Sequence, residues 1–263
     1  MRMRTRAVGV LLTALGCTMA GATSEAAPAP AAQPAKPKAA RFVDAPCAGC
    51  RAVLPPPSGD PTAPIPLLVV LHGDWGLGPG DMLASWERHA LAKGVGVLAL
   101  QCPRDQGCKG SWWQWNGEPS WVTAQVDALA TSSKRAFDRD RLFLAGWSGG
   151  ATYIGLRAQT LERTFAGLVY HGGGMAPFDS TCHVQGSAFF LTGTGNPLHS
   201  HVVGLRRFHE ACNDDVTWKV LPGADHTAEW KALDAHGGAI VDWLLTKRRA
   251  SPKAAVSERE PAR

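Results

Sequence analysis

The sequence predicts an α/β protein with a mostly parallel central sheet and helices on both faces. Several short apolar runs are continuous rather than alternating, as strands covered on both faces tend to be. Amphipathic segments with helical spacing lie between these runs. This alternation of strand and helix is typical of a parallel sheet, because each crossover helix packs back onto a face of the sheet.

Six apolar runs are expected to be buried strands. They occupy residues 67–71, 95–100, 142–145, 167–170, 188–191 and 216–221. Four segments with apolar residues at helical spacing are expected to be helices. They occupy residues 81–93, 120–136, 150–163 and 229–246. Ligands bind beyond the C-terminal ends of the strands in such sheets, so the residues that follow each run are the candidates for chemistry.

Length and composition predict one folded domain with tails. The chain has 263 residues, of which 45% are hydrophobic and 19% are charged, as in ordinary globular proteins. The domain is expected at residues 41–250. Residues 23–40 are rich in Ala and Pro and cannot bury enough apolar surface to fold, so they are expected to be a linker, and residues 251–263 a disordered tail.

Residues 1–22 are interpreted as a signal peptide. Three arginines precede the apolar run at residues 7–16, which is too short to span a bilayer comfortably, and Ala20-Gly21-Ala22 offers a cleavage site. In a second interpretation, Leu15-Gly16-Cys17 resembles a lipoprotein box in which Cys17 is lipidated. We expect an exported protein, periplasmic or extracellular, with membrane attachment only if Cys17 is lipidated.

The net charge gives no reason to expect a nucleic-acid partner. Of the formal charge of +5, three units come from the arginines of the signal segment. The remaining excess is too small to form a basic face. The run Lys247-Arg248-Arg249 is interpreted as a solvated tail.

The cysteines support export. Beside Cys17 there are six, and an even number in an oxidising compartment predicts three disulfides. Proximity along the chain favours the pairs Cys47–Cys50, Cys102–Cys108 and Cys182–Cys212. The CxxC at residues 47–50 could instead be a redox motif or half of a zinc site, but no second CxxC exists.

A candidate nucleophile follows the third expected strand. Gly146-Trp147-Ser148-Gly149-Gly150 matches G-x-S-x-G in a strand-to-helix context. In this turn the serine backbone is strained, and side chains on its neighbours would crowd it. The alternative is a glycine-rich packing turn with a passive serine. We expect the turn to lift the Ser148 hydroxyl above the sheet, near the positive end of the next helix.

Two further strand ends carry candidate residues. After the first expected strand comes His72-Gly73-Asp74, and the backbone N–H groups of Asp74 and Gly149 are expected to form an oxyanion hole. His72 is interpreted as a structural residue that orders this loop. After the last expected strand comes His226, which is in the position for a general base, with a solvated loop histidine as the alternative.

These features resemble the α/β-hydrolase family over about residues 64–246. The resemblance rests on the His72-Gly73 loop, on the segment 137–150 and on the late His226. Within the family the chain looks most like secreted polyhydroxybutyrate-depolymerase-like and feruloyl-esterase-like proteins, and more loosely like dienelactone hydrolases. The resemblance implies a serine hydrolase that acts on a small or polymeric ester, with no cofactor and no metal.

The acid of the family's triad is missing from its usual loop. The family pattern Gly-Thr-x-Asp-Pro aligns its acid with Asn196, and residues 192–201 contain no carboxylate. An amide brings no full charge to the imidazole, and in a trypsin-like enzyme the Asp→Asn change costs about 10⁴ in kcat. Either Asn196 orients His226 weakly, or another carboxylate substitutes, with Asp179 as the first choice. A third possibility is a relative that binds a ligand and turns over little.

Ten tryptophans are many for this length, and several cluster after Cys108. Together with tryptophans beside the proposed site they could form a stacking wall for a substrate. The alternative is a layer that caps the sheet under a long loop. The substrate-binding candidates are Trp75, Trp113, Trp115 and Trp147. We expect a secreted serine esterase, with a non-catalytic protein that binds carbohydrate or polyester as the alternative and an exopeptidase-like hydrolase as a more distant one.

Overall fold

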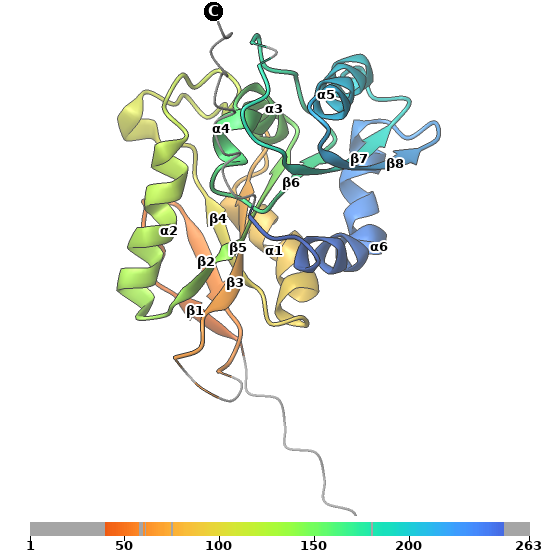
Figure 1. Cartoon of the computed structure of the whole chain (residues 1–263). Coiled ribbons are helices and arrows are strands. Elements are labelled where there is room, and N and C mark those ends of the chain that lie inside the picture. Colours follow the sequence, from red (N-terminus) through yellow and green to blue (C-terminus); the bar gives the residue numbers. More distant parts are fainter. Residues whose placement is uncertain (1–39, 58–59, 61, 75, 180, 250–263) are drawn as a thin grey trace, which may run out of the picture. The chain divides into compact units, whose positions relative to one another are not determined.

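An eight-stranded sheet forms the centre of the computed structural model, which describes residues 40–249 except residues 58, 59, 61, 75 and 180 (Figure 1). The strand order is β1-β2-β4-β3-β5-β6-β7-β8. The strands are β1 (Arg41–Val43), β2 (Arg51–Leu54), β3 (Ile65–Leu71), β4 (Gly96–Leu100), β5 (Phe137–Trp147), β6 (Gly167–His171), β7 (Ser187–Gly193) and β8 (Asp215–Leu221). β3 to β8 are parallel, and β1 and β2 add an antiparallel edge.

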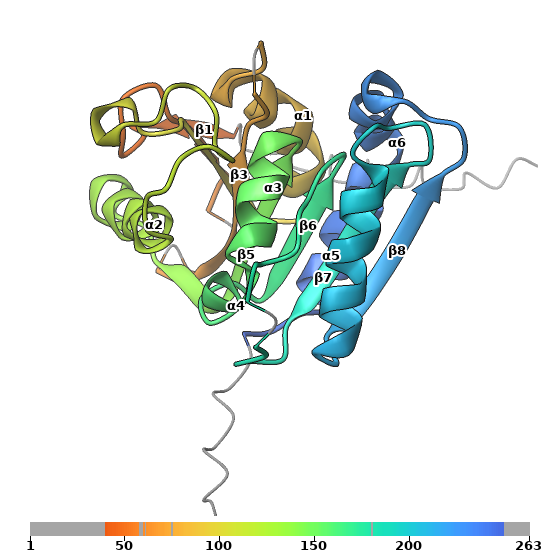
Figure 2. The same ribbon diagram turned by 90° about the horizontal axis from the view of Figure 1, so that it is seen from above.

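Helices cover both faces of this sheet (Figure 2). They are α1 (Pro79–Leu91), α2 (Ser120–Ser133), α3 (Gly149–Leu156), α4 (Ala158–Leu161), α5 (His199–Ala211) and α6 (His226–Leu245), with a short 3₁₀ turn η1 (Arg104–Gln106). One hydrophobic core lies between the sheet and α1 and α6, and the other lies between the sheet and α2, α3, α4 and α5. β3 contributes side chains to both cores, because its residues alternate between the two faces of the sheet. Leu68 and Val70 face the first core, and Leu67, Val69 and Leu71 face the second.

The predicted fold class is confirmed. Each of the six expected strands is present, and all four expected helical segments are helical. The expected helix at 150–163 is two helices, because Arg157 leaves the helical conformation with φ −124°. The last helix begins at His226, three residues earlier than expected. β1, β2 and α5 were not predicted.

The three predicted disulfide pairs are present. Cys47 pairs with Cys50, Cys102 with Cys108, and Cys182 with Cys212. The last pair ties the loop after β6 to the end of α5 and encloses the longest segment, with a sequence separation of 30. On the chain-entropy view a loop of this length contributes about 3.6 kcal/mol to stability.

Two terminal regions lie outside the described residues. They include the expected signal peptide with Cys17, the linker up to residue 39 and the expected tail at 251–263. The described residues all belong to one compact unit. Among them, no helix combines the length and apolar character that crossing a membrane requires.

The sheet topology brings several loops to one edge. β3 is flanked by β4 and β5, and the chain runs outward from it in both directions, so the strand order reverses there. Loops that leave neighbouring strands at such a point diverge and open a crevice. The residues that follow β3, β5, β6, β7 and β8 therefore define the place to look for a site.

Candidate active site

A strained turn between β5 and α3 presents Ser148. The residue has φ 51° and ψ −111°, which L-residues rarely adopt, and its N–H donates to the His171 carbonyl at 2.9 Å. Gly146 and Gly150 flank this turn because a side chain at either position would collide with neighbouring backbone atoms. A Cβ on Gly146 would lie 2.4 Å from the Ala151 nitrogen, and one on Gly150 would lie 2.7 Å from the backbone oxygen of His72. The turn expected from G-x-S-x-G is present.

His226 lies within hydrogen-bond distance of this serine. Its Nε2 is 2.9 Å from Ser148 Oγ. His226 is the first residue of α6 rather than a loop residue, and Asp225 caps the helix by accepting from the Ala228 N–H at 2.8 Å. For Nε2 to accept the serine proton, the other ring nitrogen must carry a hydrogen.

Glu229 is the acceptor for that second nitrogen. Its Oε2 is 3.1 Å from His226 Nδ1, and the side chain is fully buried. The two residues are three apart on the first turn of α6, so their side chains share a face of the helix. Ser148, His226 and Glu229 therefore form a continuous chain with the geometry of a catalytic triad.

Neighbouring groups satisfy the buried Glu229 carboxylate. Oε1 accepts from the Gly193 N–H and lies 3.4 Å from Thr192 Oγ1. Oε2 accepts from Asn196 Nδ2 at 2.5 Å in addition to His226. Burying a carboxylate is costly unless it is hydrogen-bonded, and these donors supply that compensation.

Asn196 lies beside the His226 imidazole, as the sequence suggested, but its hydrogen bonds are made to other groups. Its two Nδ2 hydrogens are directed to the Gly172 carbonyl at 3.1 Å and to Glu229 Oε2, and its Oδ1 accepts from the Leu198 N–H. Nδ2 is also 3.1 Å from His226 Nδ1, but neither hydrogen remains for that nitrogen. Asn196 thus holds Glu229, and the carboxylate orients the ring.

The structure does not bring Asp179 to the imidazole, so this expectation is corrected. Asp179 is exposed and accepts from the N–H and the hydroxyl of Thr181 at 2.9 and 2.5 Å. These two donors hold the pKa of the Asp179 carboxyl below its usual value. Glu229 was missed because the family pattern directs attention to loops. The available signal was its position one helical turn after His226.

The expected oxyanion-hole residues lie against each other. Gly149 begins α3, and a Cβ added to it would fall 2.4 Å from Asp74 Oδ1. Burial raises the pKa of the Asp74 carboxyl, and the donors Ser111, Trp112 and Trp113 partly oppose that shift. This contact involves the Asp74 carboxylate, and the oxyanion hole expected from the backbone N–H groups of Asp74 and Gly149 stays a prediction.

His72 has the structural environment expected for it. The ring is buried, with Nδ1 2.6 Å from the Gly73 carbonyl and Nε2 accepting from the Cys102 N–H at 3.2 Å. Burial lowers the pKa of His72, which favours the neutral ring that these contacts require. It thereby joins the loops that follow β3 and β4.

His171 is a second buried histidine, which sequence reasoning missed. It ends β6, and its Nε2 lies 2.7 Å from the Glu229 carbonyl. Burial lowers its pKa to about 4, so the ring is neutral at pH 7 and donates to that carbonyl. His171 thereby fixes the backbone that carries Glu229.

The tryptophans divide between core and surface. Trp112 and Trp115 are buried and pack against Tyr153, so the capping interpretation holds for them and the substrate-binding expectation for Trp115 is wrong. Trp147 is also buried, 4% exposed, and its ring stacks on His226 rather than lining a groove. Trp113 is 42% exposed. Trp75 lies outside the described residues.

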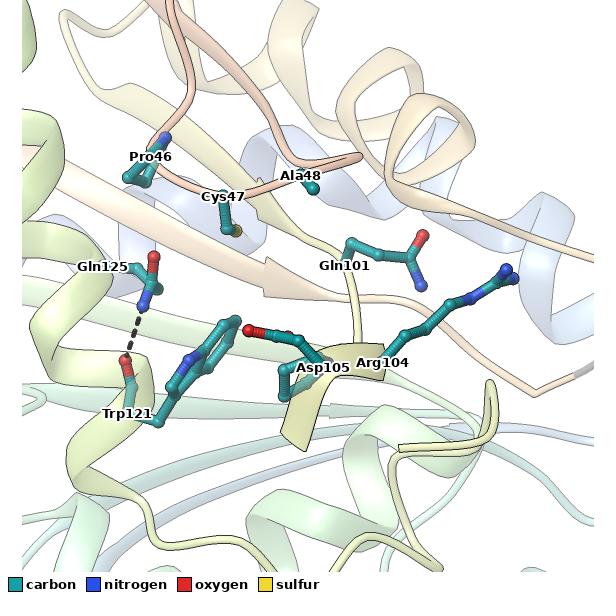
Figure 3. A pocket seen from close by; sticks show the side chains of 9 residues that line it. Pro46, Cys47, Ala48, Gln101, Arg104, Asp105, Trp121 and Gln125 are labelled. Atoms are coloured by element: carbon teal, nitrogen blue, oxygen red, sulfur yellow. Dashed lines mark hydrogen bonds between the residues drawn. The ribbon is translucent and has the colours of Figure 1, made fainter. Parts of the chain in front are cut away.

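Two hollows flank this end of the sheet. One, of about 640 Å³, lies at the C-terminal end of α3 and is lined by Trp113, Met175, Phe178 and the Arg157 turn. The other, of about 530 Å³, is bordered by the Cys47–Cys50 disulfide, Arg104 and Trp121 (Figure 3). None of the triad residues lines either hollow.

One cluster among the described residues has the composition of a metal site. Single ligand atoms of Glu162, His209 and Asp214 all lie within 4.8 Å of one another. The His209 Nδ1 to Asp214 Oδ2 distance of 2.6 Å is that of a charge-assisted hydrogen bond, and Tyr170 takes the other ring nitrogen at 3.0 Å. The cluster is therefore interpreted as a buried ion pair.

Comparisons with known proteins show the fold. No family model matches the chain, and no curated protein matches it. Among solved structures, it is similar to a hormone-sensitive lipase from a metagenome library, with a TM-score of 0.58 and 14% identity over 81% of this chain and 87% of that one. It is also similar to the S-formylglutathione hydrolase FrmB of Staphylococcus aureus (TM-score 0.56, 15% identity, 74% and 92% covered) and to a Bacillus cereus carboxylesterase (0.52, 20%, 69% and 88%). The chain has the α/β-hydrolase fold.

Proposed function

We propose that this protein is an exported serine hydrolase that cleaves carboxylic esters. The observation that carries the proposal is the chain from Ser148 Oγ to His226 Nε2 at 2.9 Å and from His226 Nδ1 to Glu229 Oε2 at 3.1 Å. A hydroxyl, an imidazole and a buried carboxylate in this order can activate a nucleophile. Solved esterases and a lipase share the fold, which supports the same reaction class.

In the first half-reaction Ser148 Oγ attacks the ester carbonyl carbon while His226 Nε2 takes the hydroxyl proton. The carbonyl oxygen becomes an oxyanion, and the N–H groups of Asp74 and Gly149 stabilise it. Glu229 stabilises the imidazolium and keeps the hydrogen on Nδ1. The intermediate then collapses, His226 gives its proton to the leaving alkoxide, and an acyl-serine remains.

In the second half-reaction a water molecule repeats the sequence. His226 removes a proton from the water as its oxygen attacks the acyl carbon, and the same N–H groups hold the second oxyanion. Collapse returns the proton from His226 to Ser148 Oγ and releases the carboxylic acid. Every step uses groups of this chain and needs no cofactor.

The substrate proposal rests on the surface beside α3. Trp113 and Phe178, which are 42% and 95% exposed, border the hollow of about 640 Å³. Exposed aromatic rings suit an aromatic acyl group or the repeating units of a polyester. This agrees with the resemblance to polyhydroxybutyrate-depolymerase-like and feruloyl-esterase-like proteins.

Export is the compartment that we propose. The N-terminal segment has signal-peptide character, and three disulfides link all six cysteines outside it, as in proteins of oxidising compartments. Secretion into the medium and anchoring through Cys17 are separated by fractionating cells that express the full chain, with Cys17→Ala as the matched variant.

The test of the activity is hydrolysis of short p-nitrophenyl esters together with labelling by a fluorophosphonate probe. Both are expected for the wild-type chain and absent from Ser148→Ala, with Ser132→Ala, at an exposed serine of α2, as the control. Unchanged labelling of Ser148→Ala would overturn the assignment of the nucleophile. A folded wild-type chain inert toward all esters and the probe would favour the binding-protein alternative.

A further inference from the structure

The indole of Trp147 lies flat against the ring of His226. The ring centroids are 4.4 Å apart and the planes differ by 13°. Trp147 is the last residue of β5, directly before Ser148, whereas His226 is 79 positions further along the chain at the start of α6. The residue beside the nucleophile therefore forms the wall on which the general base rests.

The surrounding backbone leaves room for this indole. A Cβ on Gly73 would fall 2.5 Å from Trp147 Cδ1, and a Cβ on Gly172 would fall 2.3 Å from its Cζ3. Gly172 also has φ +62°, a conformation that favours glycine. Two loops, one after β3 and one after β6, thus carry glycine where the indole passes.

Two further rings, both uncharged at pH 7, pack against the Trp147 indole. His171 lies 4.5 Å away at 58°, and Trp230 lies 5.2 Å away at 58°. The charged and titratable groups around His226 are Glu229 at Nδ1, the capping Asp225 one residue earlier, and neutral His171 behind the indole. Among the described residues, Trp147 is thus the aromatic side chain whose ring stacks on His226.

A cation held over an indole face is attracted by the ring quadrupole, and the attraction increases when water is excluded. His226 is neutral before Ser148 attacks and becomes an imidazolium in the transition state. A parallel stack places that new charge over the electron-rich face of the indole. The contact therefore stabilises the transition state more than the resting state.

We propose that Trp147 is a positioning residue for catalysis: its indole holds His226 in plane with Ser148 and Glu229 and stabilises the imidazolium formed during acyl transfer. This rests on the proposed function, because it acts through the general base of that reaction. Trp147, the residue before the serine that the G-x-S-x-G pattern leaves unspecified, would thereby support the proton transfer through His226.

The test compares Trp147→Leu, which keeps apolar bulk without a π face, with Trp147→Phe, which keeps a smaller one. Trp230→Leu is the matched control, because the Trp230 ring contacts the rings of Trp147 and His171 whereas His226 stacks on Trp147. Trp147→Leu is expected to lower kcat by about threefold to tenfold with KM little changed.

The decisive readout is the acidic limb of the pH profile of kcat/KM. Loss of the π face weakens the charged form of His226, so the limb moves to lower pH by about half a unit in Trp147→Leu and by less in Trp147→Phe. Trp230→Leu is expected to leave the limb in place. A folded Trp147→Leu protein with an unmoved limb overturns the proposal.

A second measurement separates this inference from the activity itself. In a Ser148→Ala background, the His226 ring is titrated by NMR with Trp or Leu at position 147. A lower midpoint for Leu supports the stack even if no ester substrate is found, and equal midpoints overturn it. If Trp147→Leu does not fold, Trp147→Phe decides, because its limb and midpoint must move in the same direction by a smaller amount.

Discussion

Glu229 Oε2 reaches His226 Nδ1 at 3.1 Å from one helical turn further along α6, so the same helix carries both the base and its acid. In the pattern that the sequence resembles, the acid comes from the loop after the preceding strand, where this chain has Asn196. The carboxylate has changed its place in the sequence while reaching the same nitrogen of the imidazole.

Glu229→Gln is expected to lower kcat by about 10³–10⁴ with little change in KM. An amide leaves no charge to stabilise the imidazolium and can present its NH₂ to Nδ1, which fixes the wrong tautomer. Steady-state kinetics on a p-nitrophenyl ester measure the effect. Asp179→Asn serves as the control, because that carboxylate is exposed and bonded to Thr181. Equal losses in the two variants would disprove the assignment.

Asn196→Asp is expected not to increase activity, although it restores the residue of the family pattern. The new carboxylate would replace the NH₂ that donates to Glu229 Oε2 at 2.5 Å, so two carboxylates would have to share a proton. In this variant the shared proton would be bound more tightly in the fold than in the unfolded chain, so the stabilisation that it gives would be lost as pH rises.

Thermal unfolding of the Asn196 variants between pH 5 and pH 9 checks this expectation. The deficit of Asn196→Asp relative to the wild type should grow with pH, whereas that of Asn196→Ala, which adds no charge, should stay nearly constant. A tenfold gain in kcat for Asn196→Asp would instead mean that position 196 is the working acid site.

The buried cluster of Glu162, His209 and Asp214 predicts a fold that weakens as pH rises across neutrality. Burial raises the pKa of Glu162 to about 7, and Asp214 and Glu162 raise the pKa of His209 against the opposing effect of burial. Gln159 donates to Glu162, and Tyr170 meets the other nitrogen of His209. Glu162 and His209 both have a raised pKa in the fold, so both bind a proton more tightly there than in the unfolded chain. The resulting stabilisation is fully present below about pH 4.5 for Glu162 and below about pH 6.5 for His209, and it is lost as pH rises through each folded-state pKa.

The wild-type melting temperature should therefore fall by roughly 3–8 °C between pH 5 and pH 8 from this cluster alone. Glu162→Gln removes one of the titrating groups and should flatten the profile. Glu210→Gln is a suitable control, because Glu210 pairs with Arg206 on the exposed side of α5. A profile of Glu162→Gln as steep as that of the wild type would contradict the prediction.

Two tryptophan variants should distinguish a residue that packs in the core from a residue that binds substrate. Trp115→Ala should cost about 3–5 kcal/mol of unfolding free energy, because its buried ring stacks on Tyr153 at 5.6 Å. Trp113→Ala should leave stability nearly unchanged and raise KM for aromatic or oligomeric esters, with little change for an acetate ester. Urea unfolding and kinetics on both ester classes measure the two effects. An equal KM change for small and large esters would remove Trp113 from the substrate surface.

The strands and the nucleophile turn were predictable because their signals are local. A continuous apolar run predicts a strand covered on both faces, and the glycines around Ser148 are required by contacts within a few residues of the turn or with β3. α5 was missed because its sequence, HSHVVGLRRFHEA, is mostly polar and includes Gly204, so its apolar stripe is narrow. The stacking of Trp147 on His226 joins residues far apart in the chain, and the periodicity of apolar residues in a sequence does not predict such a contact.

The break at Arg157 is also a tertiary effect. Helical spacing continued through residues 150–163, but the Arg157 guanidinium bonds the Trp115 carbonyl at 2.8 Å and lies 4.1 Å from the Tyr153 ring centroid. Tyr153 lies one turn earlier in α3, but Trp115 belongs to a loop outside the helix, so this hydrogen bond could not be anticipated from the helix alone.

Because α6 carries both His226 and Glu229, a displacement of that helix moves the proton acceptor and its counter-charge together. The loop between β7 and α5 supplies the amide of Asn196 in place of an ionised group, and Gly193 at the end of β7 donates its N–H to the Glu229 carboxylate. Changes within this loop, residues 194–198, that spare those two contacts should therefore be tolerated by the reaction, so the loop can acquire new surface contacts while the proton relay stays intact.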